Sequence, residues 1–135
     1  MLHEIIKRLN EESWVGAIVE QEYAKKLKEH GLKIRPDLII HIPFDEKHHK
    51  SRREGNFAVI ELKLKCTMAQ AAKDYEHIAE MCSKLDYAAG VFVNIGSSET
   101  YYHKYVGINK EKIVAFGVEL LQGKVKLTEY KTSNA

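Results

Sequence analysis

The sequence has few of the residues that stabilise small secreted proteins or join separate domains. Its 135 residues include two cysteines, Cys66 and Cys82, and two prolines. The cysteines lack metal-ligand spacing, so neither a disulfide framework nor a structural zinc site is expected. We interpret both as reduced thiols in a cytoplasmic protein. No stretch rich in Gly, Ser or Pro divides the chain, and its length suits a single domain, residues 1–135.

Long apolar runs are also missing. Leu38-Ile39-Ile40 is an example of the short runs that do occur, whereas a membrane-spanning helix needs roughly 20 apolar residues. The segment Met1-Leu2-His3-Glu4 does not follow the basic-then-apolar pattern of a signal peptide. With 44% hydrophobic and 30% charged residues, the composition is that of a globular domain rather than of a disordered or membrane protein.

The net charge of +2 says little about partners, but one segment is strongly basic. Residues 47–53 include Lys47, Lys50, Arg52 and Arg53, with no acidic residue among them. A single basic run is most often a solvated loop. Its alternative role is to contact the phosphates of a nucleic acid.

Hydrophobic periodicity predicts a mixed α/β domain. A helical stripe runs from Trp14 to Leu27, and a second helix is expected over residues 68–85. Strands are expected over residues 34–42, 56–64, 88–95, 113–121 and 124–130. Gln122-Gly123 separates the last two strands and is a suitable hairpin turn. The segment 97–109 is ambiguous, and its Tyr101–Tyr105 cluster either packs its rings on the sheet or stacks on bases.

Charged residues occur where two of these strands are otherwise apolar. Side chains alternate along a strand, so Glu61 and Lys63 point to the same face, after Phe57 and Val59. If strands 34–42 and 56–64 are antiparallel neighbours, the beginning of one lies beside the end of the other. Asp37 would then lie close to Glu61.

Two carboxylates and a lysine in one place favour a divalent cation. Mg²⁺ prefers a few carboxylate oxygens together with waters and substrate phosphate oxygens. A metal-bound water becomes a nucleophile near neutral pH, and Lys63 can orient that water or offset charge on the phosphoryl group. The expected chemistry is phosphodiester hydrolysis.

The segments Arg35-Pro36-Asp37-Leu38-Ile39-Ile40 and Val59-Ile60-Glu61-Leu62-Lys63 resemble the PD-(D/E)XK nuclease superfamily over about residues 10–95. The resemblance implies a restriction endonuclease-like fold with an α-β-β-β-α-β core, here followed by a C-terminal β-hairpin. We therefore expect an endonuclease that depends on Mg²⁺ or Mn²⁺ and cuts DNA in preference to RNA. Members of the superfamily often work as dimers, so the resemblance suggests a homodimer. Asp37, Glu61 and Lys63 would be its catalytic residues.

The same resemblance extends the metal site beyond Asp37 and Glu61. The backbone carbonyl of Leu62 would be a ligand, and Glu11 would add a carboxylate from the first helix. Its neighbour Glu12 is the alternative, although helical spacing places Glu11 nearer the apolar stripe. Nucleic acid would be contacted by five basic residues, namely Lys47, Lys50, Arg52, Arg53 and Lys65.

Two other interpretations fit the same residues. A catalytically silent binding or assembly module could use the same fold, since folds persist after chemistry is lost. Alternatively, the charged residues form an ordinary ion network on an unrelated α/β fold. That interpretation predicts that Asp37 and Glu61 lie far apart.

Overall fold

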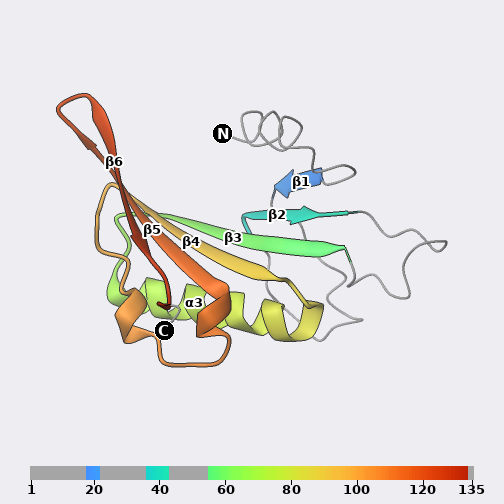
Figure 1. Cartoon of the computed structure of the whole chain (residues 1–135). Coiled ribbons are helices and arrows are strands. Elements are labelled where there is room, and N and C mark those ends of the chain that lie inside the picture. The colour runs from blue at the N-terminus through green and yellow to red at the C-terminus, as the bar shows by residue number, and fades with distance from the viewer. Residues whose placement is uncertain (1–17, 22–35, 43–54, 134–135) are drawn as a thin grey trace.

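In the computed structural model, residues 18–21, 36–42 and 55–133 are described, and their strands form one six-stranded mixed sheet (Figure 1). The elements follow the chain as β1 (Ile18–Gln21), β2 (Leu38–His41), β3 (Asn56–Leu64), α3 (Met68–Leu85), β4 (Ala89–Ile95), β5 (Ile113–Leu121) and β6 (Lys124–Tyr130). Short 3-10 helices occupy Tyr102–Lys104 and Lys110–Lys112, between β4 and β5. The strands lie in the sheet in the same order as in the chain.

The centre of the sheet is parallel and its two margins are antiparallel. β3 pairs with β4, and β4 with β5, in parallel, whereas the β1–β2, β2–β3 and β5–β6 pairs are antiparallel. Parallel neighbours require a crossover connection. α3 supplies the crossover from β3 to β4 and lies along one face of the sheet (Figure 1). The antiparallel β2–β3 pair is the arrangement that the sequence analysis required to bring Asp37 near Glu61.

α3 begins with a capping box. The Thr67 hydroxyl accepts the backbone N–H of Gln70 at 3.2 Å, and the Gln70 side chain accepts the backbone N–H of Thr67 at 2.9 Å. These bonds satisfy two donors at the helix start. The helix is terminated by its C-cap residue Asp86, whose φ of 55° is left-handed.

In the described part of the chain, no helix is both long and apolar enough to cross a membrane.

The hydrophobic core lies between α3 and the sheet. Tyr75 and Ile78 of α3 and Phe92 of β4 have no solvent exposure. The rings of Tyr75 and Phe92 lie 4.9 Å apart between centroids, a distance typical of favourable aromatic contacts. Cys66 and Cys82 are buried free thiols, which confirms the prediction that they are not disulfide-bonded.

Several predicted elements are confirmed. The strand over 56–64, the helix over 68–85 and the hairpin strands over 113–121 and 124–130 have the bounds that the sequence predicts. Gln122 and Gly123 both have positive φ, 51° and 76°, as the type I′ turn of a two-residue hairpin requires. The hairpin projects beyond the rest of the described sheet (Figure 1).

The predicted helix from Trp14 to Leu27 is wrong where the structure describes it. Ile18–Gln21 is strand β1, paired with β2 through Ile18↔His41 and Gln21↔Leu38. Ile18 and Val19 are β-branched and suit a strand, and hydrogen bonding to the edge of β2 overrides a helical spacing of apolar residues. The rest of that segment lies outside the described residues.

Candidate active site

The β2–β3 register brings the two predicted carboxylates together. Leu38 is paired with Ile60, so the residue before β2 lies beside the residues that follow Ile60. Asp37 Oδ2 accepts the backbone N–H of Leu62 at 2.8 Å. The Asp37 side chain thus continues the β2–β3 ladder beyond Leu38, the first residue of β2. The interpretation in which Asp37 and Glu61 lie far apart is contradicted by this geometry.

Glu61 lies in the middle of the site, on the face of the sheet that α3 covers. Its side chain is 5% exposed, and its partner across β3 and β4 is the fully buried Phe92. Burial is the largest influence and raises the pKa of Glu61 from 4.5 to about 8. The charges of Asp37 and Asp74 and a hydrogen bond with Asp37 act in the same direction, whereas Lys63 opposes them. Without a cation, Glu61 therefore keeps its proton at neutral pH.

Lys63 shares the Glu61 face and reaches toward α3. Its Nζ lies 3.2 Å from Oδ2 of Asp74. Burial opposes the charge on Lys63, but the carboxylate of Asp74, with those of Glu61 and Asp37, raises its pKa above 10.5. Lys63 is therefore an ammonium at every pH at which the protein would work.

Asp74 is the site residue that the sequence analysis missed. It lies on the buried side of α3 and is 6% exposed. Burial raises the pKa of its carboxyl, and the positive charge of Lys63 acts against that shift. The available signal was a carboxylate on the apolar stripe of the helix that follows Glu-x-Lys, but its partner depends on how α3 docks on the sheet.

Asn94 of β4 fixes the end of β3 next to the site. It is paired with Lys63 across the parallel strands and is 1% exposed. Its Oδ1 accepts the backbone N–H of Cys66 at 3.0 Å, and its Nδ2 donates to the carbonyl of Glu99 at 2.7 Å. Both ends of the amide are satisfied, so Asn94 supports the strand end that carries Lys63 rather than offering a free ligand.

The donor set suits a hard divalent cation that keeps several waters. Asp37 and Glu61 provide carboxylate oxygens, the ligands Mg²⁺ prefers, and Mg²⁺ is usually bound by one or two of them. Within the described ranges, no group of three His, Cys, Asp or Glu side chains is arranged to hold a metal ion. A cation here would therefore rely on two carboxylates, the Leu62 carbonyl, water and substrate oxygens. Glu11, the predicted additional carboxylate, lies outside the described residues, as does Glu12.

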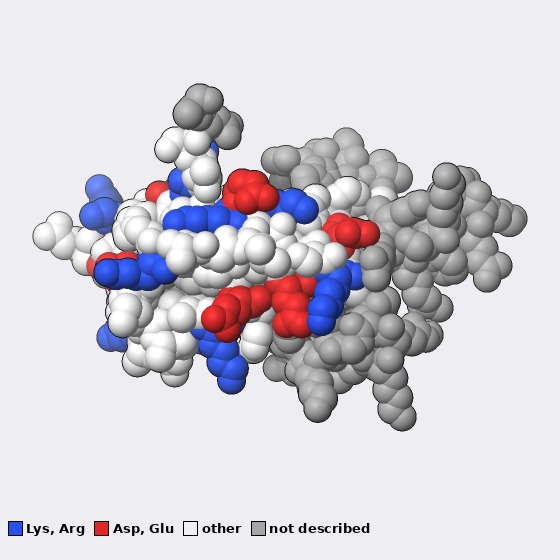
Figure 2. Space-filling view, turned by 90° about the horizontal axis from the view of Figure 1, so that it is seen from below, with Lys and Arg blue, Asp and Glu red and all other residues white. Residues whose placement is uncertain are grey.

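Of the five basic residues predicted to contact nucleic acid, the structure describes Lys65. Lys65 is exposed and follows the end of β3 with a left-handed φ of 46°, so it lies outside the side-chain alternation of that strand. Lys47, Lys50, Arg52 and Arg53 lie outside the described residues. On the side of α3, Figure 2 shows basic and acidic side chains interspersed, with acidic side chains gathered over part of that face.

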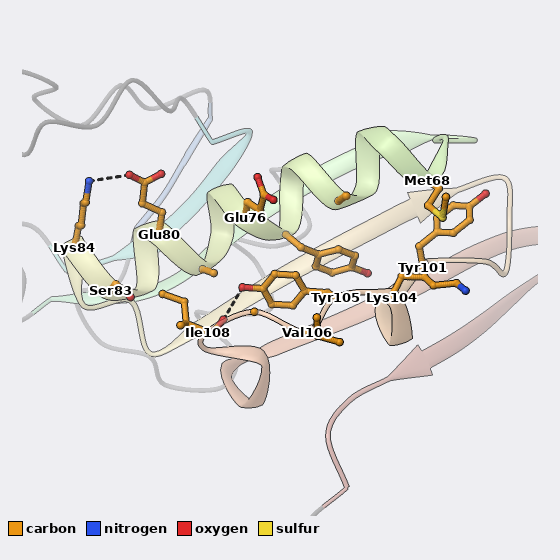
Figure 3. A pocket seen from close by; sticks show the side chains of 14 residues that line it. Met68, Glu76, Glu80, Ser83, Lys84, Tyr101, Lys104, Tyr105, Val106 and Ile108 are labelled. Atoms are coloured by element: carbon orange, nitrogen blue, oxygen red, sulfur yellow. Dashed lines mark hydrogen bonds and ion pairs between the residues drawn. The ribbon is translucent and has the colours of Figure 1, made fainter.

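A cavity of about 560 Å³ lies between α3 and the segment after β4 (Figure 3). Its lining includes Tyr75, Tyr101, Tyr105 and Ile108 but neither Asp37 nor Glu61. The Tyr105 ring stacks on Tyr75 at 5.6 Å, and its hydroxyl donates to the Ile108 carbonyl at 2.6 Å.

In the Tyr101–Tyr105 cluster, the central Tyr102 packs its ring inside the protein instead of offering it to a base. Tyr102 is 4% exposed, and its ring meets the Tyr75 ring edge-on at 6.2 Å between centroids. Its hydroxyl lies 2.9 Å from the Thr132 hydroxyl. A ring enclosed in this way has no free face on which a base could stack.

Comparisons with protein-family models, curated proteins and solved structures give no match for this chain. The class of protein that the structure itself defines is a mixed α/β domain in which the half-buried Asp37 and the buried Glu61 lie beside a Lys–Asp ion pair. What the site does is inferred from the geometry of the chain.

Proposed function

We propose that this chain is a divalent-metal-dependent nuclease that hydrolyses phosphodiester bonds, and that its sheet is the restriction endonuclease-like core of the PD-(D/E)XK superfamily. The observation that carries the proposal is the Asp37–Glu61 pair, with Lys63 on the same face two residues later. The fold inference is supported by the order of elements, since antiparallel β2 and β3 are followed by α3 and by β4 parallel to β3.

The protonation of Glu61 supports a cation rather than a bare carboxylate pair. A buried pair at neutral pH either keeps a proton or binds a positive ion. Lys63, the nearest ammonium in the sequence, is paired with Asp74, and the described residues contain no ion pair between Lys63 and Glu61. Among the described residues, no ammonium is therefore paired with Glu61 at the position proposed for the cation.

Asp37, Glu61 and the carbonyl of Leu62 would hold Mg²⁺ or Mn²⁺. The bound ion would activate a water and stabilise the charge that develops on the phosphoryl group. The water oxygen bonds to phosphorus as the bond from phosphorus to the leaving oxygen breaks. The water loses one proton to solvent, and the leaving oxygen takes one. Lys63 presents its ammonium to the phosphoryl oxygens and offsets their negative charge.

DNA is the proposed substrate, with the basic segment 47–53 and Lys65 as its phosphate contacts. Binding through several lysines and arginines releases counterions, so affinity should fall steeply as salt is raised. A homodimer is the assembly that the proposed superfamily suggests for cutting two strands.

The test is cleavage by purified wild-type protein of supercoiled plasmid, single-stranded DNA and single-stranded RNA, each with Mg²⁺, Mn²⁺ or EDTA. We expect strand breaks in DNA with either metal and none in EDTA. Equal cleavage in EDTA would contradict a metal-dependent mechanism. Folded protein that cuts none of these substrates with either metal would contradict the nuclease proposal.

A silent binding module is the second candidate, and one observation favours it. Within the described residues only two carboxylates are available to a cation, because Asp74 is engaged by Lys63. A binding module would retain a labelled duplex equally well in Mg²⁺ and in EDTA, and would not cut it. A gel-shift series in both buffers therefore separates the two candidates.

A further inference from the structure

The carboxylate of Asp74 occupies an unusual position for a charged group. It lies on the side of α3 that faces the sheet, where Ala71, Tyr75 and Ile78 are fully buried. Placing a carboxylate among such residues costs free energy unless a partner compensates for its charge. A helix surface offers many exposed positions at which the same residue would cost nothing, so this location calls for a specific partner.

That partner is Lys63. Oδ2 of Asp74 is buried from solvent, and the ammonium of Lys63 lies 3.2 Å from it. The lysine side chain is 33% exposed, whereas that of Asp74 is 8% exposed. The pair therefore has an anchored end on α3 and an accessible end at the face of the sheet that carries Glu61.

Lys63 has a second set of carboxylates within reach of its long side chain. Glu61 precedes it by two residues on the same face of β3, and Asp37 contacts the backbone of the intervening Leu62. An ammonium that settled between Asp37 and Glu61 would compensate both charges and occupy the position proposed for the cation. A lysine has a flexible four-carbon chain and, unlike arginine, no rigid planar group that fixes the direction of its hydrogen bonds. The lysine side chain itself therefore does not prevent the ammonium from moving between Asp37 and Glu61.

We propose that Asp74 is a positioning residue that holds the Lys63 ammonium on the α3 side of the site, away from the Asp37–Glu61 pair. The inference rests on the proposed nuclease function. In this arrangement Asp74 keeps the carboxylate pair open to a cation and fixes the ammonium where a phosphoryl oxygen can meet it. Asp74 itself touches neither the cation nor the substrate.

A residue that acts through another should have no effect once that other residue is removed. The experiment is a double-mutant cycle of Asp74→Asn and Lys63→Met, with kcat and KM measured for Mg²⁺-dependent DNA cleavage. Asp74→Asn keeps the shape of the side chain and removes its charge. We expect it to lower kcat by about 10- to 100-fold, the range for groups that orient a catalytic ligand, with little change in KM.

In the Lys63→Met background, adding Asp74→Asn should leave kcat within about threefold of the Lys63→Met value, because coupled residues are not additive. Glu80→Gln is the matched control. It removes the carboxylate of an exposed ion pair with Lys84 on the same helix, and it should cleave like the wild type. Effects of Asp74→Asn and Lys63→Met that multiply would overturn the positioning role.

Melting temperature provides a second cycle that does not depend on activity. Lys63→Met leaves the buried Asp74 without its cation and should lower the melting temperature. The double variant should melt above Lys63→Met alone, and a double variant that melts lower would contradict the pairing. A wild-type protein that cuts no substrate would remove the nuclease proposal and this inference together. If the wild type cuts DNA but the effects of Asp74→Asn and Lys63→Met on kcat multiply, only this inference would be removed.

Discussion

Replacing Asp37 with asparagine is expected to reduce metal-dependent cleavage by about 10³-fold or more, the scale for removal of a group that the reaction requires. Asparagine is almost the same size as aspartate, and its carbonyl oxygen can still accept the backbone N–H of Leu62, which Asp37 accepts at 2.8 Å. The β2–β3 junction should therefore survive. What is lost is a negative charge beside Glu61, and with it one of the two carboxylates proposed to hold the cation.

This variant separates a structural role of Asp37 from a chemical one. We expect its free energy of unfolding to stay within about 1 kcal/mol of the wild-type value, as measured by urea unfolding in EDTA. Cleavage rates with Mg²⁺ and Mn²⁺ would be compared with those of the wild type and of Glu80→Gln. An Asp37→Asn protein that is folded and cleaves at the wild-type rate would show that the site is misplaced.

Glu61→Gln is expected to lose cleavage and, in the absence of metal, to gain stability. Burial, followed by the charges of Asp37 and Asp74, raises the pKa of Glu61 from 4.5 to about 8. The folded protein thus binds the Glu61 proton more tightly than the unfolded chain does. The stabilisation from this proton is fully present below pH 4.5 and is lost as the pH rises through about 8.

The expected size of that loss is about 5 kcal/mol at most, since each pKa unit corresponds to roughly 1.4 kcal/mol and the pKa rises from 4.5 to about 8. Burial also raises the pKa of Asp74, against the opposing charge of Lys63, and so adds a change of the same sign. Glutamine carries no charge at any pH, so Glu61→Gln should be more stable than the wild type at pH 8 and above. The difference should shrink toward zero near pH 4.5.

The measurement is urea unfolding of wild type and Glu61→Gln in EDTA at intervals between pH 4.5 and 9. A second series with Mg²⁺ at pH 8 should raise the stability of the wild type, because a ligand that binds only the folded state stabilises it. Glu61→Gln should gain little from the metal. Stability curves that run parallel over the whole pH range would contradict the buried, proton-holding Glu61.

The elements that could be predicted from the sequence are those in which local pattern and tertiary environment agree. The β5–β6 hairpin is bounded by alternating strands and by Gln122-Gly123, whose positive φ values suit the turn. α3 has an amphipathic period and a capping box at Thr67 and Gln70. In these segments each local preference favours the observed structure, so the bounds are clear before any contact is known.

The strand Ile18–Gln21 could not be predicted in the same way. Its apolar residues follow a helical spacing. Its strand structure comes from pairing with β2 (Leu38–His41), which is distant in the sequence. Pairing between distant segments leaves little trace in a local pattern.

The site likewise contains residues that could be predicted from the sequence and one that could not. Asp37, Glu61 and Lys63 are visible in the sequence because strand alternation and an antiparallel pair are enough to bring them together. Asp74 is separated from Lys63 by the turn into α3, and the apolar stripe of that helix does not show which strand residue Asp74 meets. Its role emerges only when α3 is docked and the Lys63–Asp74 distance of 3.2 Å is known.

The proposed chemistry depends on a divalent cation that Asp37 and Glu61 bind together. Isothermal titration of Mn²⁺ into wild type, Asp37→Asn and Glu80→Gln at pH 8 tests this binding without any assumption about the substrate. We expect saturable binding by wild type and Glu80→Gln, and binding weakened by about tenfold or more in Asp37→Asn. Equal binding by wild type and Asp37→Asn, or no binding by the folded wild type, would contradict it.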